Sequence, residues 1–254
     1  MTGLPRVHAQ RVLSTLKRGS SWPVVVETDS GRFVTKLRGA AQGVPALIAE
    51  VIAAELATIA GLPVPERVIV ELEWPMPSEL RVDEFLDLLS RSPGENLGFR
   101  WLQGARELTA KELAAVPDEF AGALLWFDGL VSNFDRSASN PNLLWWKGQP
   151  WLIDHGATLT FQYDWAGISE ATPREPFALD THVFAERREL LIAADSALNA
   201  RFDRARLERA VAVVPESWLR AAFPNDDPAR VRASYQAFLW KRLKAPRPFV
   251  PGGA

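Results

Sequence analysis

The sequence predicts an α+β fold with two lobes: a small N-terminal lobe built on an antiparallel sheet with one main helix, and a larger, mainly helical C-terminal lobe. Segments of strand composition come first and helical segments follow. A chain of 254 residues exceeds the usual size of a single core and leaves room for a cleft. Its 47% hydrophobic and 24% charged residues are the ordinary globular mix. We place the lobes at residues 1–103 and 104–254.

The small lobe begins with a hairpin. Trp22–Glu27 and Phe33–Leu37 have strand composition, and the turn between them ends in a glycine that can adopt a positive φ. A helix follows over Pro45–Ala60, where apolar residues recur at helical spacing until Gly61 stops it. The lobe therefore starts as an antiparallel pair followed by one helix.

Two further strands are predicted in the small lobe, over Val64–Leu72 and Leu97–Leu102. Residues 74–94 lie between them, are rich in proline and contain the amphipathic piece Leu80–Leu89. We interpret residues 74–94 as a surface insertion that adds little to the core.

In the large lobe, Thr109 is a candidate cap for a helix over residues 110–116. A strongly apolar helix is predicted over Glu119–Val131. A second hairpin follows, formed by residues 142–146 and 150–153.

The last third of the chain, from Glu186 to Ala254, is predicted to be mainly helical, most clearly at residues 207–213 and 231–243. Basic residues outnumber acidic ones in this third. We interpret that excess as solvated helix faces.

Composition excludes several classes of protein. A net charge of -2 implies no broad basic surface for nucleic acid or an anionic membrane. The absence of cysteine removes disulfides, thiolate metal sites and cysteine nucleophiles, and three scattered histidines do not make a zinc hydrolase site. No segment has the pattern of a signal peptide, and no run of apolar residues approaches the eighteen that a membrane span needs, so we expect a cytoplasmic protein.

The densest polar cluster lies over residues 132–142, between the apolar helix and the second hairpin, and contains Asp135 and Asn140. A second carboxylate, Asp154, ends the apolar strand Trp151–Ile153. Carboxylate and amide oxygens hold Mg²⁺, and a separate carboxylate can orient an attacking hydroxyl. This pattern favours phosphoryl transfer from a nucleotide, with helix caps and Asx-turns as the structural alternative.

Upstream, Lys36 ends an apolar strand and Glu50 lies in the first half of the helix that follows. A strand lysine paired with a helix glutamate can hold a point charge against nucleotide phosphates. Glu55, five positions later, is the alternative partner for the lysine.

These residues resemble those of the HipA-like kinases, a branch of the protein-kinase-like superfamily related also to the phosphoinositide kinases, and in particular the short stand-alone form. The motifs that support the resemblance are Val34-Thr35-Lys36-Leu37, Glu50 with Gly61-Leu62-Pro63-Val64-Pro65, Ser132-Asn133-Phe134-Asp135-Arg136, Asn140-Pro141-Asn142-Leu143-Leu144 and Trp151-Leu152-Ile153-Asp154-His155-Gly156. The resemblance covers nearly the whole chain and implies a bilobal protein-kinase-like fold.

The cofactor-binding residues that the resemblance implies are Lys36, Glu50, Gly19, Ser20, Ser21 and Trp101. Lys36 resembles the phosphate-binding lysine and Glu50 its ion-pair partner. The segment 17–21 stands where a phosphate-covering loop should lie, although it lacks a full Gly-x-Gly-x-x-Gly. Trp101 falls at the expected hinge between the lobes.

Asp135 resembles the catalytic aspartate of the family. Arg136 completes the family's Asp-Arg pair, where it would stabilise the loop or the developing phosphoryl charge. Asn140 and Asp154 resemble the Mg²⁺ ligands, with Asn142 as the alternative to Asn140.

The resemblance implies an ATP- and Mg²⁺-dependent phosphotransferase that acts on a hydroxyl group. The acceptor it favours is Ser or Thr of a protein, including this chain itself. A small-molecule kinase is the first alternative. The second is a kinase-like module that binds a partner or nucleotide without catalysis, which the incomplete glycine-rich loop would favour. We expect no nucleic-acid or membrane partner.

Some side chains near these motifs are expected to be structural. Asp128 in the apolar helix is interpreted as a satisfied carboxylate, and His155 as packed or bonded to the catalytic loop. Ten tryptophans beside two tyrosines are unusual. Among them, Trp145, Trp146 and Trp151 are expected to clamp the second hairpin onto the large lobe.

Overall fold

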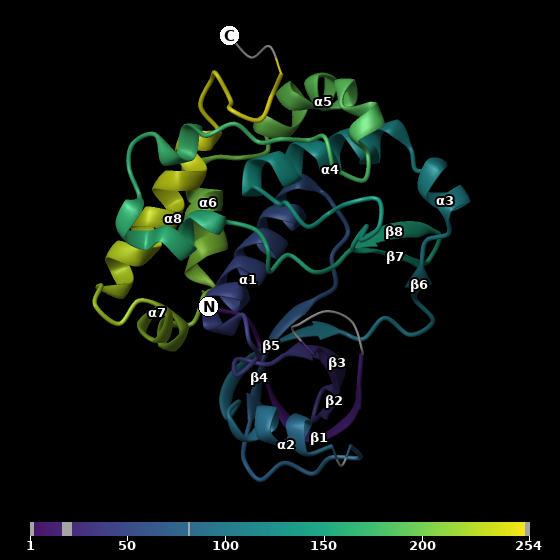
Figure 1. Cartoon of the computed structure of the whole chain (residues 1–254), viewed down its shortest axis with the longest axis vertical. Coiled ribbons are helices and arrows are strands. Elements are labelled where there is room, and N and C mark those ends of the chain that lie inside the picture. Colours follow the sequence, from purple (N-terminus) through teal and green to yellow (C-terminus); the bar gives the residue numbers. More distant parts are fainter. Residues whose placement is uncertain (1–2, 17–21, 81, 252–254) are drawn as a thin grey trace.

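The computed structural model describes residues 3–16, 22–80 and 82–251. It contains a closed barrel of strands and a larger helical part, which Figure 1 shows at opposite ends of the molecule. Most strands precede most helices along the chain, as the sequence predicts. The fold is α+β, and the division of the chain at residue 103 stays a prediction.

The barrel strands are β1 (Arg6–Thr15), β2 (Val24–Thr28), β3 (Gly31–Lys36), β4 (Arg67–Leu72) and β5 (Gly94–Arg100). Their order around the barrel is β1-β2-β3-β5-β4, and β1 closes it by pairing with β4. The β1–β4 pair is parallel and the other pairs are antiparallel. The structure thus corrects the predicted antiparallel sheet, because the sheet closes on itself through a parallel pair.

The strand that closes the barrel, β1, is missing from the sequence prediction. Of its ten residues only Val7 and Val12 are buried, and the others are exposed or partly exposed. The strand therefore shows no clean alternation of buried and exposed side chains, which is the main signal for a strand in a sequence. It also makes register shifts against β2, which interrupt the alternation further.

Gly98 on β5 faces a crowded barrel interior. A methyl group added there would lie 2.6 Å from Cγ2 of Val70 and 2.9 Å from Cγ2 of Val68. We expect Gly98→Ala to lower the free energy of unfolding by about 1–3 kcal/mol in urea denaturation, because overpacking forces neighbours off their rotamers. Gly3→Ala is the control, since its added methyl meets nothing within 4 Å. Equal stability of the two variants would contradict this packing.

Helix α2 (Asp83–Ser90) lies against the barrel on the side away from the helical part (Figure 1). Phe85, Leu88 and Leu89 on the helix, and Met76 before it, are buried in the same core as the barrel strands. The prediction that residues 74–94 add little to the core is therefore wrong. The amphipathic helix uses its apolar face to cover the barrel.

Helix α1 (Gly43–Ala60) is the main helix and packs against α4, α6 and α7 as well as β5. It ends at Gly61, which adopts φ 81° and donates its N–H to the last turn. Within the described part of the chain, α1 is the one helix long and apolar enough to cross a membrane. Because 72% of that stretch is buried inside the protein, its apolar character is explained by core packing.

The helical part contains α3 (Ala110–Ala114), α4 (Asp118–Val131), α5 (Glu189–Asn199), α6 (Arg204–Ala212), α7 (Glu216–Ala222), α8 (Pro228–Arg242) and three 3-10 helices, η1 (Thr160–Gly167), η2 (Thr172–Arg174) and η3 (Ala185–Arg187). Helix α4 packs against α5, and α8 against α6. Buried side chains of α1, α4, α5, α6, α7 and α8 belong to one hydrophobic core. The predicted Thr109 cap is present as a capping box with Glu112.

A second, three-stranded sheet consists of β6 (Arg106–Glu107), β7 (Leu143–Trp146) and β8 (Gln149–Leu152). Strands β7 and β8 are the predicted second hairpin, which turns at Lys147 and Gly148, both with positive φ. The N–H of Leu152 donates to the carbonyl of Pro63 (2.8 Å). The hairpin is thereby attached to the segment that follows α1.

Candidate active site

Lys36, Glu50 and Asp154 meet where the end of β3, the side of α1 and the segment after β8 come together. Nζ of Lys36 donates to Oε1 of Glu50 and to Oδ1 of Asp154, the latter at 2.7 Å. Glu55 contacts Arg67 instead, with Nε of the arginine 3.2 Å from Oε1. The structure therefore places Glu50, and not Glu55, against the predicted phosphate-binding lysine.

The ammonium group of Lys36 is shared by the carboxylates of Glu50 and Asp154. Glu50 is fully buried, whereas the Asp154 side chain is 44% exposed. Burial raises the pKa of Glu50 to about 7 against the opposing pull of Lys36. Burial would also raise the pKa of Asp154, but Lys36 outweighs it and lowers that pKa to about 2. The more open carboxylate thus stays ionised near neutral pH and can bind a cation.

The turn after β8 is built for close approach to α1. Asp154 adopts a positive φ of 56°, which few residues other than glycine and Asn or Asp tolerate. Two positions later, a methyl group added at Gly156 would lie 3.2 Å from Oε1 of Glu50. The Asp-His-Gly turn therefore uses both residues to bring the Asp154 carboxylate beside Lys36.

Asp135 lies exposed on the loop between α4 and β7. Its Oδ2 accepts hydrogen bonds from Nδ2 of Asn140 (3.0 Å) and Nδ2 of Asn142 (3.1 Å). Each asparagine thus uses its amide nitrogen on Asp135 and keeps its amide oxygen for another ligand. The two asparagines that the sequence left as alternatives both touch the same carboxylate.

Asn142 connects this loop to the Lys36 group. Its backbone carbonyl accepts the N–H of Ile153 (3.0 Å), the residue immediately before Asp154. Asn142 is 8% exposed and adopts a positive φ of 49°, whereas Asn140 is exposed. Backbone pairing therefore places Asp135 and Asp154 on two adjoining segments.

Arg136 is buried under the loop and belongs to a network around Asp128. Its Nε donates to Oδ2 of Asp128 (2.6 Å), and its NH1 donates to the carbonyls of Pro141 (3.0 Å) and Asn142 (2.8 Å). These contacts hold the two ends of the polar loop together. The geometry favours loop positioning for Arg136, and its predicted role in the reaction stays a prediction.

Asp128 satisfies several donors at once, in agreement with its interpretation as a structural carboxylate. Besides Arg136 it accepts Nδ2 of Asn133 (2.9 Å) and contacts Nε2 of His182 (2.9 Å). Nδ1 of His182 accepts the N–H of Phe184 (3.0 Å), which places the ring proton on Nε2, toward Asp128. His182 escapes sequence reasoning because it lies far along the chain and belongs to no motif.

His155 follows Asp154 and is 1% exposed. Burial, aided by nearby Arg136, lowers the pKa of its imidazole to about 3. Its Nδ1 lies 3.4 Å from NH2 of Arg136, and its ring packs edge-on against Phe127. His155 is therefore neutral and packed at physiological pH, as the sequence suggests, and unsuited to act as a general base.

The remaining predicted nucleotide contacts are less defined by the structure. Gly19, Ser20 and Ser21 lie outside the described residues. Trp101 follows β5, is partly buried, and donates its indole N–H to Oε1 of Gln103 (3.0 Å). Its role in nucleotide binding stays a prediction.

Tryptophans stabilise the hairpin itself. The rings of Trp146 and Trp151 pack edge to face with centroids 4.9 Å apart, and the indole N–H of Trp146 donates to the carbonyl of Gln103 (3.0 Å). The latter bond ties the hairpin to the segment between β5 and β6. Trp126 on α4 is fully buried and donates to Oδ1 of Asp195 (2.7 Å) on α5.

The donor set of the site suits a hard divalent cation that binds few protein groups. In the described ranges, no three His, Asp or Glu side chains lie close enough to hold a metal by themselves. Asp154 instead offers an ionised carboxylate, and Asn140 and Asn142 offer amide oxygens. Mg²⁺ is commonly bound in this way, with one or two carboxylates completed by nucleotide phosphates and water.

Comparisons with known proteins identify the fold and the family of this chain. A solved structure, the Helicobacter pylori proinflammatory kinase CtkA, superposes with a TM-score of 0.54 at 11% sequence identity, covering 90% of this chain and 89% of that one. At this identity the likeness shows the fold, which is kinase-like. A search of curated proteins finds no match. The family model for HipA-like kinases matches residues 9–243, so the chain belongs to the HipA-like kinase family.

Proposed function

We propose that this protein is an ATP- and Mg²⁺-dependent kinase that transfers a phosphoryl group to the hydroxyl of Ser or Thr in a protein, including its own chain. The observation that supports the proposal best is the double contact of Lys36 with Glu50 and Asp154. It joins a buried partner on α1 to an ionised, partly open carboxylate, within a chain of the HipA-like kinase family. Bound ATP would supply the phosphoryl group, and Mg²⁺ would neutralise the negative charge of the phosphates.

Each polar side chain has a distinct task in this proposal. Lys36 holds the nucleotide phosphates, and Glu50 keeps the lysine in place from inside the protein. Asp154 would hold Mg²⁺, a role that suits its ionised and partly open carboxylate. The bound ion would supply positive charge beside the phosphates.

Asp135 orients the acceptor hydroxyl. Asn140 and Asn142 fix its Oδ2, and Oδ1 has no hydrogen-bond partner in the part of the chain that the structure describes. Oδ1 is therefore free to accept the proton of an incoming hydroxyl. A carboxylate whose orientation is set by two amide donors is suited to general-base work.

The acceptor is identified by incubating the protein with labelled ATP and Mg²⁺, alone and with cell extract. We expect label on protein, and phosphoserine or phosphothreonine after acid hydrolysis. Label that appears only in small metabolites would show a small-molecule kinase. A failure to release or transfer phosphate under any condition would refute a catalytic function.

The two asparagines are distinguished by their effect on the metal requirement. We expect Asn140→Ala to raise the Mg²⁺ concentration that gives half-maximal transfer by at least about tenfold, because a direct metal ligand is lost. Asn142→Ala is the matched variant, since it also removes an amide donor to Asp135. It should lower the rate with a smaller change in the metal requirement. The reverse result would make Asn142 the ligand.

A further inference from the structure

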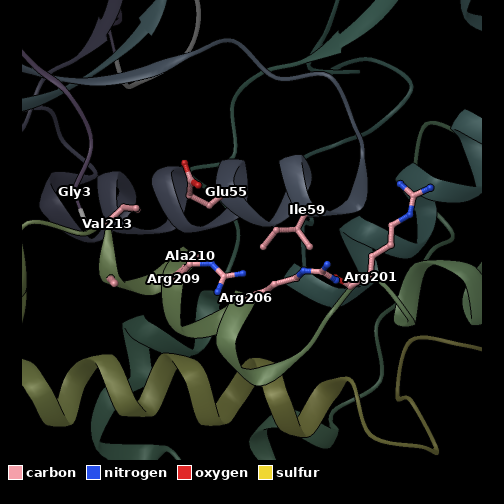
Figure 2. A pocket seen from close by; sticks show the side chains of 9 residues that line it. Gly3, Glu55, Ile59, Arg201, Arg206, Arg209, Ala210 and Val213 are labelled. Carbon is pink, nitrogen blue, oxygen red and sulfur yellow. The ribbon is translucent and has the colours of Figure 1, made fainter. Parts of the chain in front are cut away.

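A pocket of about 490 Å³ lies between α1 and α6, away from Lys36 and Asp154. Its volume falls in the range of small-molecule sites, roughly 300–1,000 Å³. Its polar lining consists of Arg201, Arg206 and Arg209 with one carboxylate, Glu55. Figure 2 shows Arg206 and Arg209 in the space between the two helices, with Glu55 and Ile59 on α1 opposite them.

The positive charge of the pocket is poorly compensated. Arg201 donates to the carbonyl of Ala60 (2.6 Å), and Arg206 donates to the carbonyl of Arg201 (2.6 Å), so both spend hydrogen bonds on neutral groups. Arg206 also forms a long, exposed ion pair with Asp203, with its Nε 3.8 Å from Oδ2. Both guanidinium groups therefore keep donors that an anion could use.

Arg209 is the most available of the three. In residues 3–16, 22–80 and 82–251 it has no hydrogen bond and no ion pair, and its side chain lines the pocket. The carboxylate of Glu55 does not neutralise it, because Glu55 is bonded to Arg67, with Nε 3.2 Å from Oε1. The pocket therefore has a net positive charge and an unpaired guanidinium.

The rest of the lining is apolar. Ile59 comes from α1, Ala210 and Ala212 come from α6, and Val213 follows α6. A bare inorganic ion would leave this apolar wall facing water, whereas a ligand with both an anionic and an apolar group would cover both kinds of surface. Guanidinium groups bind phosphate through paired hydrogen bonds.

We propose that the pocket between α1 and α6 binds a small organic phosphate monoester, with its phosphate on Arg206 and Arg209 and its apolar group against Ile59 and Val213. The site is separate from the nucleotide site. Ile59 lies nine residues after Glu50 on α1, about two and a half helical turns, and so faces away from it. The inference does not depend on catalytic activity, since it concerns binding alone.

Isothermal titration calorimetry of the full chain with phenyl phosphate, in about 0.1 M NaCl, tests the proposal. We expect saturable binding that phenol, its neutral counterpart, does not show, and weaker binding of inorganic phosphate. Arg209→Ala should weaken the binding of phenyl phosphate at least tenfold, because a charged hydrogen-bond donor is lost. Arg209→Lys, which keeps the charge, should recover part of the loss.

Two control variants test whether phenyl phosphate binds in the pocket between α1 and α6. Arg220→Ala removes an exposed arginine of α7, which is paired with Glu216, and should leave the affinity for phenyl phosphate unchanged. Lys36→Met removes the phosphate-binding lysine of the nucleotide site and should also leave it unchanged. The proposal would be overturned by any one of three results. These are no binding of phenyl phosphate to the wild type, an unchanged affinity in Arg209→Ala, or loss of binding in Lys36→Met.

Discussion

Replacing Asp135 with asparagine is expected to lower the rate of phosphoryl transfer by a factor of about 10²–10⁴, the usual contribution of a general base. Asparagine keeps the size of the side chain but cannot take a proton from the acceptor hydroxyl. Nucleotide affinity should stay near that of the wild type, because Lys36, Glu50 and Asp154 are untouched. Rates with labelled ATP and nucleotide titration of both proteins measure the two effects.

Asp180→Asn is the matched control for this variant. Asp180 is also a carboxylate in the C-terminal half of the chain, but its side chain is 82% exposed and its ion pair with Arg188 spans 3.8 Å. It should transfer phosphate at the wild-type rate. Wild-type transfer by Asp135→Asn would show that Asp135 does not act on the acceptor, whatever the role of Lys36.

The largest loss of stability is expected for Asp128→Ala, which should lower the free energy of unfolding by about 3–5 kcal/mol. The substitution would leave the guanidinium of Arg136 buried without its carboxylate, and would also remove a hydrogen-bond acceptor from Asn133 and His182. An unpaired buried charge costs far more than the contact itself contributes. Urea denaturation monitored by tryptophan fluorescence measures the loss.

Asp118→Ala provides the comparison on the same helix. Asp118 also pairs with an arginine, Arg187, but its side chain is 77% exposed. Exposed ion pairs contribute about 0–1 kcal/mol, so this variant should be nearly as stable as the wild type. Similar losses for the two variants would mean that the network around Asp128 does not stabilise the loop.

The same carboxylate gives a pH dependence with a defined sign. Burial would raise the pKa of Asp128, but Arg136 and the hydrogen bond from His182 outweigh it and lower that pKa below its ordinary value. As the pH falls, the carboxylate of Asp128 is therefore protonated in the unfolded chain at a higher pH than in the folded protein. The contribution of Asp128 is complete above its ordinary pKa of about 4 and is lost as the pH falls below that value. The stability gap between wild type and Asp128→Asn should narrow over the same range.

The positions of the predicted site residues follow from local patterns that a single sequence contains. Lys36 ends a strand, Glu50 sits on the following helix, and Asp154 ends the second hairpin, and the structure brings the three together. Asp135 and the two asparagines likewise meet on one loop. Helical spacing, turn residues and strand composition depend on neighbours a few positions away, so they can be read without a fold.

Other features depend on residues that are distant along the chain. Whether Glu50 or Glu55 meets Lys36 is decided by the direction in which α1 packs, and Arg67 takes the second glutamate. His182 reaches Asp128 from a separate segment that no pattern connects to it. Sequence spacing contains no information on such contacts unless a motif happens to cover both partners.

The sequence by itself determined the α+β class, most of the helices and strands, and the order of the polar motifs, because propensity and periodicity act locally. Only the tertiary structure decided that β1 closes the sheet into a barrel, that α2 covers that barrel, and that arginines of α6 meet α1 in a pocket. Strand pairing and helix packing minimise exposed apolar surface and unpaired backbone groups over the whole chain. That minimum is a property of all the segments together, which no single segment specifies.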